Sequence, residues 1–283
     1  MTRREILSGF VPGSDFRAFL ALQPDAVLVE ITHTQGSTPR EAGTFMLVST
    51  SSVWGTIGGG HFEFIAIGNA RALLASAGGT DMMDIPLGPE IGQCCGGRTQ
   101  LRFRRVTKSV RDELEKKQES EVERMPEVYV FGAGHVGRAL AAALAPLPLS
   151  VTVIETRKEE LANLPASTKS RLVPMPEALV KNMPADAVLV ILTHDHALDF
   201  LIAGEALART DFAYVGMIGS ATKRATFANW LIREAGGERS WLDRLTLPIG
   251  GSAVKDKRPE VIAAMTAAEI LTALEAYRDR SSS

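Results

Sequence analysis

The feature that most constrains the fold is a GxGxxG motif at residues 132–137, placed between an apolar run and an alanine-rich stretch. Its candidate ligand-binding residues are Gly132, Gly134, His135 and Gly137. Between a strand and a helix, such glycines permit a tight turn, close approach of a diphosphate to the backbone, and close helix packing. Glu155 follows 23 residues after Gly132, near the spacing at which a carboxylate accepts from a ribose hydroxyl. The motif predicts a Rossmann-like unit that can hold a dinucleotide; a glycine turn kept only for packing is the alternative.

The pattern of apolar runs divides the chain into two domains joined by a charged segment. After the motif, the runs SVTVIET, AVLVILTH and AYVGMIGS are separated by stretches expected to be helical, which is typical of a parallel, doubly wound sheet. Before it, four strand-like segments and one helix near residues 62–77 predict an α+β fold. We therefore expect an N-terminal α+β domain with glycine-rich loops at 1–107, a charged linker at 108–126 and a Rossmann-like domain at 127–283.

Composition excludes several classes of protein. The chain has 283 residues and a net charge of −2, which does not favour nucleic-acid binding or an anionic membrane surface. The most apolar stretch, 139–154, is interrupted by prolines and is too short to span a bilayer. Cys94 and Cys95 are adjacent, which excludes a disulfide framework and a four-cysteine zinc site. With no secretory signal evident, we expect a cytoplasmic protein.

Polar residues follow the strand-like run AVLVILT in the second domain. His194 and His196 are accompanied by Asp195 and Asp199, at the edge where such sheets bind ligands. Two imidazoles and two carboxylates can transfer protons or hold a metal ion. Asp195 is equally suited to cap the helix that follows, with both histidines merely hydrogen-bonded.

Three glycine-rich segments in the first domain, at residues 35–43, 55–63 and 92–98, predict a binding surface. Their candidate residues are Arg40, Gly58, Gly59, Gly60, Glu63, Cys95, Gly96 and Gly97. Arg40 can add charge-assisted bonds to a phosphate. Cys95 is a candidate ligand for a soft metal if its thiolate is accessible, or an inert buried residue. Glu63 is either a carboxylate that complements the helix dipole or a general base.

The segments GSTPREAGTFMLV, GTIGGGHFE, CCGG, VFGAGHVGRAL, THDHALD, YVGMIGS and RPEVIAAMTAAEI resemble, in this order, the XdhC/CoxI family. The resemblance extends from about Gly36 to Leu271. Members of this family are accessory factors of xanthine dehydrogenase, which implies that the chain is not an enzyme of the pathway itself. It implies binding of the molybdenum cofactor (molybdopterin), sulfuration of that cofactor by a cysteine desulfurase, and its insertion into apo xanthine dehydrogenase or a related molybdenum hydroxylase.

The resemblance also assigns residues. Cys95, Gly96 and Gly97 match the family's CGG motif, while Gly58–Gly60 and Glu63 match its GGGxxE motif. It implies that the cofactor lies between these residues and Arg40. Glu155 stands where the family more often has aspartate.

Two other functions stay open at this stage. The first is an NAD-dependent oxidoreductase that uses the Rossmann-like domain, with His194 or His196 as acid or base. The second is a redox-sensing regulator that responds through Cys94 and Cys95. The apolar helix predicted at Pro259 to Leu274 leads us to expect a homodimer.

Overall fold

The computed structural model describes residues 16–88, 96–166 and 168–281. The chain divides into two compact units, residues 1–120 and 121–283. The division lies within the charged segment 108–126. Cys94 and Cys95 lie outside the described residues.

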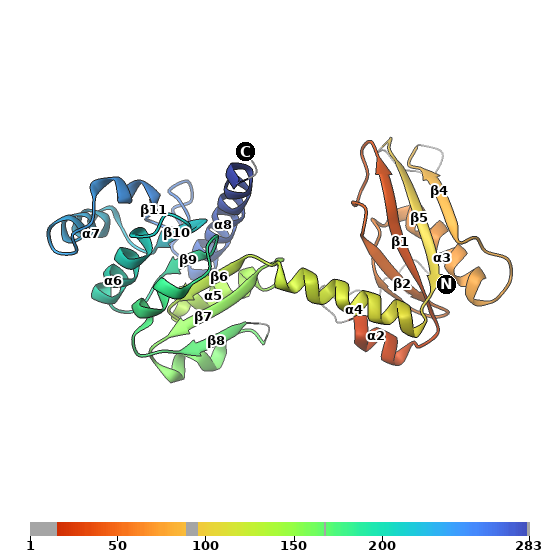
Figure 1. Cartoon of the computed structure of the whole chain (residues 1–283), viewed down its shortest axis with the longest axis horizontal. Coiled ribbons are helices and arrows are strands. Elements are labelled where there is room, and N and C mark those ends of the chain that lie inside the picture. The colour runs from red at the N-terminus through yellow and green to blue at the C-terminus, as the bar shows by residue number, and fades with distance from the viewer. Residues whose placement is uncertain (1–15, 89–95, 167, 282–283) are drawn as a thin grey trace. The chain divides into compact units, whose positions relative to one another are not determined.

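Unit 1 is built on a five-stranded antiparallel sheet of order β3-β2-β1-β5-β4 (Figure 1). Its strands are β1 (Ala26–Gln35), β2 (Phe45–Ser49), β3 (Val53–Gly55), β4 (Met82–Pro86) and β5 (Arg98–Arg105). Its helices are α2 (Phe16–Leu22), α3 (Gly60–Leu74) and α4 (Lys108–Glu123). The sequence patterns predicted every one of these strands except β4.

The central strand β1 has a hydrophobic core on each of its faces. Val27, Val29 and Ile31 pack with Phe62 and other residues of α3. The alternating residues Ala26 and Leu28 belong to a second cluster, with side chains of α2 and α4. Successive side chains of a strand point to opposite faces, so this nearly continuous apolar run suits a strand that is covered on both sides.

The charged segment is largely helical, and its helix α4 packs on unit 1. Its buried Val110 and Leu114 complete the cluster beside α2. Arg104 forms a bidentate ion pair with Glu113, with N···O distances of 2.7 and 2.9 Å. Lys117 donates to the carbonyl of Gly43 over 2.7 Å. A helix with two apolar contact positions and a charged outer face fits this composition.

Unit 2 contains a six-stranded parallel sheet of order β11-β10-β9-β6-β7-β8. The strands are β6 (Glu127–Phe131), β7 (Ser150–Glu155), β8 (Lys169–Leu172), β9 (Val188–Ile191), β10 (Tyr214–Met217) and β11 (Leu245–Thr246). The α-helices are α5 (His135–Leu144), α6 (His196–Leu207), α7 (Ala221–Arg233) and α8 (Pro259–Ser281). This strand order is that of a Rossmann sheet, and the parallel, doubly wound sheet that was predicted is confirmed.

Helices cover both faces of this sheet (Figure 1). Val188 and Val190 of β9 face a core shared with α5 and α8. Leu189 and Ile191 of the same strand face a core shared with α6 and α7. Strands that are buried on both faces need apolar residues throughout, which explains the run AVLVIL.

The prediction of an ordinary helix between β7 and β9 is wrong. The structure has two 3₁₀ helices there, η2 (Lys158–Asn163) and η3 (Pro176–Asn182), with β8 between them. Prolines at 165, 174 and 176 interrupt the segment, and each removes a backbone donor that a continuous α-helix would need. A third 3₁₀ helix, η4 (Arg239–Arg244), precedes β11.

Among the described residues, no helix is both long and apolar enough to cross a bilayer.

Candidate functional site

Residues of all three glycine-rich segments of unit 1 meet at one end of its sheet. The backbone of Gly97 runs so close to the turn after β1 that an added Cβ would lie 2.2 Å from Ser37 O. At Gly58 an added Cβ would lie 2.6 Å from the ring of Pro39. Gly58 also has φ +131°, a conformation that other residues rarely adopt. Glycine is therefore needed at these two positions for the segments to pack together, and we call their common surface the three-loop surface.

Glu63, in the first turn of α3, fixes the shape of the triple-glycine turn. Its Oε2 accepts hydrogen bonds from Ile57 N at 3.0 Å, from Gly59 N at 3.1 Å, and from the Thr56 hydroxyl. The residue is 7% exposed. Of the two roles predicted for Glu63, these contacts favour the structural one, because an oxygen with three donors is poorly placed to take a proton from a ligand.

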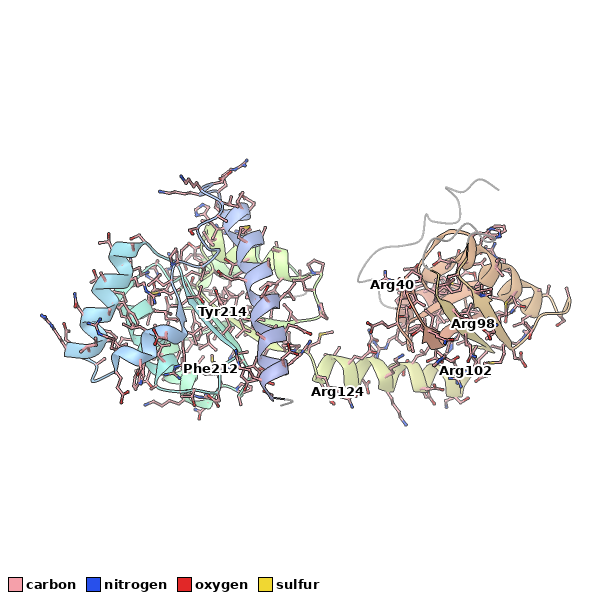
Figure 2. The ribbon with its side chains drawn as sticks, turned by 90° about the horizontal axis from the view of Figure 1, so that it is seen from above. Arg40, Arg98, Arg102, Arg124, Phe212 and Tyr214 are labelled. Atoms are coloured by element: carbon pink, nitrogen blue, oxygen red, sulfur yellow. The ribbon has the colours of Figure 1, made fainter. Side chains whose placement is uncertain are left out.

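The outer part of the three-loop surface is backbone and one arginine. An added Cβ at Gly59 or Gly96 would meet nothing within 4 Å, so ligand atoms can approach the main chain there. Gly60 begins α3, where the first N–H groups have no partner within the helix. Arg40 is exposed and forms no ion pair with any other described residue; Figure 2 labels it together with Arg98, which pairs with Asp84 at 2.7 Å. Cys95, the predicted metal ligand, lies outside the described residues.

In unit 2 the GxGxxG loop forms the expected strand–turn–helix between β6 and α5. An added Cβ at Gly137 would lie 2.1 Å from Gly132 O, and one at Gly132 would lie 2.4 Å from Leu192 O. Gly134, by contrast, has open space around it. The loop lies where the strand order reverses, between β6 and β9, which is where open parallel sheets bind ligands. Gly132, Gly134, His135 and Gly137 all line a pocket of about 260 Å³ at this point, the glycine-loop pocket.

Glu155, at the end of β7, is buried with both carboxylate oxygens bonded to nearby backbone. It is 3% exposed, and its Oε2 accepts from Ala133 N at 2.9 Å. Its Oε1 accepts from the backbone N–H groups of Thr156 and Arg157, at 2.8 and 3.1 Å. Burial raises the pKa of Glu155, but the Ala133 N–H, the Arg157 side chain and the other N–H donors outweigh it and lower that pKa below its usual value. Glu155 thus stabilises the loop, and its contact with a ribose stays a prediction.

Both predicted histidines lie at this edge of the sheet. His194 lines the glycine-loop pocket, together with Arg157 and Thr193. His194 and His196 also line a neighbouring pocket of about 350 Å³ that extends to Lys223. Asp195 caps α6, accepting from Ala197 N at 2.8 Å, so the capping alternative is correct for this residue. No group of three or more His, Cys, Asp or Glu side chains that could hold a metal ion occurs within the described ranges.

One ion pair at this edge, between Lys223 and Asp199, was not predicted from the sequence. The Lys223 ammonium lies 2.5 Å from Asp199 Oδ2, and the two side chains are 9% and 0% exposed. The residues lie 24 positions apart, on α7 and α6. Each residue lies in a helix that follows the carboxyl end of a strand, which indicates a common edge of the sheet but gives no sign that the two side chains pair.

A larger pocket, of about 410 Å³, lies elsewhere in unit 2, beside Phe212 and Tyr214 (Figure 2). None of the predicted site residues lines it. Its Arg209 is bound to Asp211 and to the carbonyls of Val180 and Met183, which gives that arginine a structural task.

Comparison with known families now identifies the chain. The XdhC Rossmann domain matches residues 128–270, and the XdhC and CoxI family matches residues 20–85. The chain belongs to the XdhC family. The family expected from the sequence motifs and the expected fold class of the XdhC chain are both confirmed.

Two similar proteins extend this comparison. The uncharacterized protein YqeB of Escherichia coli (strain K12) is 27% identical to this XdhC-family chain over an alignment of 259 residues, which covers 86% of the chain and 42% of YqeB. The chain therefore spans about two fifths of that relative. A crystal structure described as a xanthine dehydrogenase from Bacillus halodurans matches with a TM-score of 0.74 at 17% identity, covering 92% of this chain and 95% of that one. At that identity the match shows a common fold.

Proposed function

We propose that this XdhC-family chain carries the molybdenum cofactor as cargo. In this proposal it holds the cofactor while a cysteine desulfurase supplies the sulfido ligand, and it helps to insert the product into apo xanthine dehydrogenase or a related molybdenum hydroxylase. The observation that carries the proposal is the three-loop surface, which combines open backbone at Gly59 and Gly96 with Arg40.

The chemistry of the cargo fits this surface. A molybdopterin has a phosphate, a flat pterin and two sulfurs around molybdenum. Main-chain donors and an arginine suit the phosphate, and close approach to glycine suits a flat ring. Cys95 also suits this cargo, because a thiolate is a suitable ligand for a soft metal. The protein then acts by binding and shielding, and the chain's own residues need make no covalent change to the cargo.

The test is anaerobic purification from a cofactor-replete host, followed by molybdenum and pterin analysis of the same sample. We expect near-stoichiometric pterin with the wild-type chain and a reduced amount with Arg40→Ala. Arg111→Ala is the matched control, because Arg111 bonds to Pro24 O ahead of β1, whereas the three-loop surface follows the other end of that strand. Absence of pterin, even after free cofactor is added, would disprove the cargo proposal.

Cys95→Ala tests the metal contact separately. We expect this variant to retain pterin and to lose molybdenum or target activation. Unchanged retention and unchanged activation of the hydroxylase would remove the thiolate from the mechanism while leaving the rest of the proposal in place.

We further propose that the glycine-loop pocket of unit 2 binds a dinucleotide. The supporting observation is the open Gly134 beside the start of α5 at the reversal of strand order, where helix N–H groups favour a diphosphate. This pocket also keeps the NAD-dependent oxidoreductase as the alternative function. Recovery of dinucleotide without pterin from the purified protein would favour that alternative.

A further inference from the structure

The carboxyl edge of the unit 2 sheet holds a largely buried cation, Lys223, that the functions proposed above do not use. The Lys223 side chain is 9% exposed and lines the pocket of about 350 Å³ with Thr193, His194, His196 and Ser220. Within the described residues, Asp199 is the one hydrogen-bond partner of its ammonium group. An ammonium has three donors, so Asp199 leaves two of its N–H groups available to a ligand in this pocket.

Asp199 fixes the position of that ammonium. Its Oδ1 accepts from Thr193 N at 2.9 Å and from the Thr193 hydroxyl at 2.7 Å, while its Oδ2 accepts from Lys223. The carboxylate is fully buried and has donors on both oxygens. Asp199 is therefore a positioning residue, and it joins the loop after β9 to helices α6 and α7.

The pocket of about 350 Å³ that Lys223 lines, called here the Lys223 pocket, continues the glycine-loop pocket along the same edge. Thr193, His194 and Ile218 line both pockets. Arg157, which follows β7, lies at one end of the combined cleft, and Lys223, which follows β10, lies at the other. A dinucleotide whose diphosphate lies on the glycine loop extends to both sides of it, so one nucleoside reaches the Lys223 end.

The groups around Lys223 favour a ligand rich in acceptor oxygens. The Asp199 carboxylate is already bonded to Thr193 and Lys223, and Oδ1 of Asp195 accepts from Ala197 N. Further donors lie beside the ammonium. Each imidazole of His194 and His196 can donate an N–H, and so can the first backbone N–H groups of α7.

We propose that Lys223, positioned by Asp199, binds acceptor oxygens in the half of a dinucleotide that lies beyond the diphosphate. These are the ribose hydroxyl oxygens or a carboxamide or carbonyl oxygen on the attached ring. The proposal rests on the dinucleotide proposed for the glycine-loop pocket, and it assigns the second half of that ligand to a defined place.

The experiment measures, by calorimetry on the full chain, binding of ADP, ADP-ribose and NAD⁺, which share one half and differ in the other. We expect ADP-ribose or NAD⁺ to bind more tightly than ADP in the wild type. The double variant Lys223→Met with Asp199→Asn removes both charges, so that neither is left buried alone. We expect it to lose about tenfold in affinity for the longer ligands, as is typical for a hydrogen bond to a charged group, with little change for ADP.

Two further variants keep the test decisive. The matched control is Lys181→Met with Glu205→Gln, which removes an exposed ion pair of 3.7 Å outside the cleft and should leave all three affinities unchanged. Lys223→Arg keeps a positive charge beside Asp199 but moves the donors, so it should bind ADP normally and lose part of the gain from the second half. Lys223→Arg provides the test of the proposal if the double variant does not fold.

Each outcome has a separate meaning. If ADP binds but the longer ligands gain nothing, or if the gain persists in the Lys223 variants, the Lys223 assignment is wrong and the glycine-loop site stands. If affinity for ADP falls as much as affinity for NAD⁺, Lys223 has only a structural role. If none of the three compounds binds to the wild type, both the dinucleotide proposal and the Lys223 assignment fail.

Discussion

The backbone N–H of Ala133 donates to Glu155 Oε2 over 2.9 Å, which ties the middle of the glycine loop to the end of the neighbouring strand. Arg157 adds its own backbone N–H to the other oxygen of the same carboxylate. The loop is therefore held in one shape by the protein's own hydrogen bonds. A rigid loop lowers the entropy cost of binding, because less of the chain has to become ordered around a ligand.

The Glu155 carboxylate should make stability depend on pH in a defined direction. The folded protein lowers the pKa of Glu155. Its contribution to the free energy of unfolding is therefore fully present above the pKa of a glutamate in the unfolded chain, about 4.3, and is lost as the pH falls through the lower pKa of the folded state. At pH 7 we expect Glu155→Gln to lower the free energy of unfolding by about 1–3 kcal/mol. The measurement is urea unfolding, at neutral pH and again at the lowest pH that the fold tolerates.

The difference between wild type and Glu155→Gln should shrink at acid pH. Glu159→Gln, which changes an exposed glutamate nearby, is the control and should show little effect at either pH. A difference that grows as the pH falls would contradict the assigned direction of the pKa shift.

Two glycines of the three-loop surface should lose stability to the same substitution for different reasons. Gly97→Ala places a Cβ against Ser37 O and Gln35 O, so we expect a loss of at least about 2 kcal/mol through displaced backbone. Gly59→Ala has free space for the added Cβ, and its cost is backbone strain alone, because φ +79° with ψ −177° is a conformation largely confined to glycine; we expect about 1–3 kcal/mol. Thermal unfolding of both variants measures the two losses, and a loss well below 1 kcal/mol for Gly97→Ala would show that its close packing is not a constraint.

Glu63 should matter more for the order of the triple-glycine turn than for proton transfer. Glu63→Ala leaves the N–H groups of Ile57 and Gly59 without their acceptor, at a cost of about 1–3 kcal/mol. Glu63→Gln keeps an acceptor oxygen, and we expect it to retain most of the stability and of the pterin binding. Pterin retention by the two variants is the measurement; if Glu63→Gln lost the cargo while remaining as stable as the wild type, the carboxylate charge itself would be required.

The Lys223–Asp199 pair should show strong coupling in a double-mutant cycle. Lys223→Met alone leaves the Asp199 charge buried without its partner, and we expect a loss of about 3–5 kcal/mol. Adding Asp199→Asn to that variant should recover part of the loss. Urea unfolding of the wild type, both single variants and the double variant gives the coupling energy, and simple additivity would contradict a direct interaction.

Local patterns account for what the sequence could predict. The glycine spacing and the apolar runs specify a strand, a turn and a helix within short segments, so the Rossmann-like unit was predictable. The strand β4 was not, because its residues Met82–Pro86 are mostly exposed and include a proline at the edge of the sheet. The 3₁₀ helices after β7 replaced an expected α-helix, since the prolines outweighed the helical pattern.

The candidate site, like the fold, was predictable only where local sequence patterns specify it. Glu63 and Glu155 could be placed beside their loops from the sequence. Their roles depend on which N–H groups each carboxylate faces, and only the folded backbone shows this. Arg40 and the open glycines were predictable as a set because they share glycine-rich segments. The pairing of Lys223 with Asp199 depends on two helices that begin after neighbouring strands, which no spacing along the chain reveals.

The two-faced strand β1 has a consequence for how unit 1 unfolds. Val29 belongs to the core under α3 and Leu28 to the core under α2 and α4, and the two residues are neighbours on one backbone. Loss of order in either core therefore frees the strand on which the other depends. Unit 1 should lose its two cores in a single cooperative step, and the three-loop surface at the end of β1 should disappear in that same step.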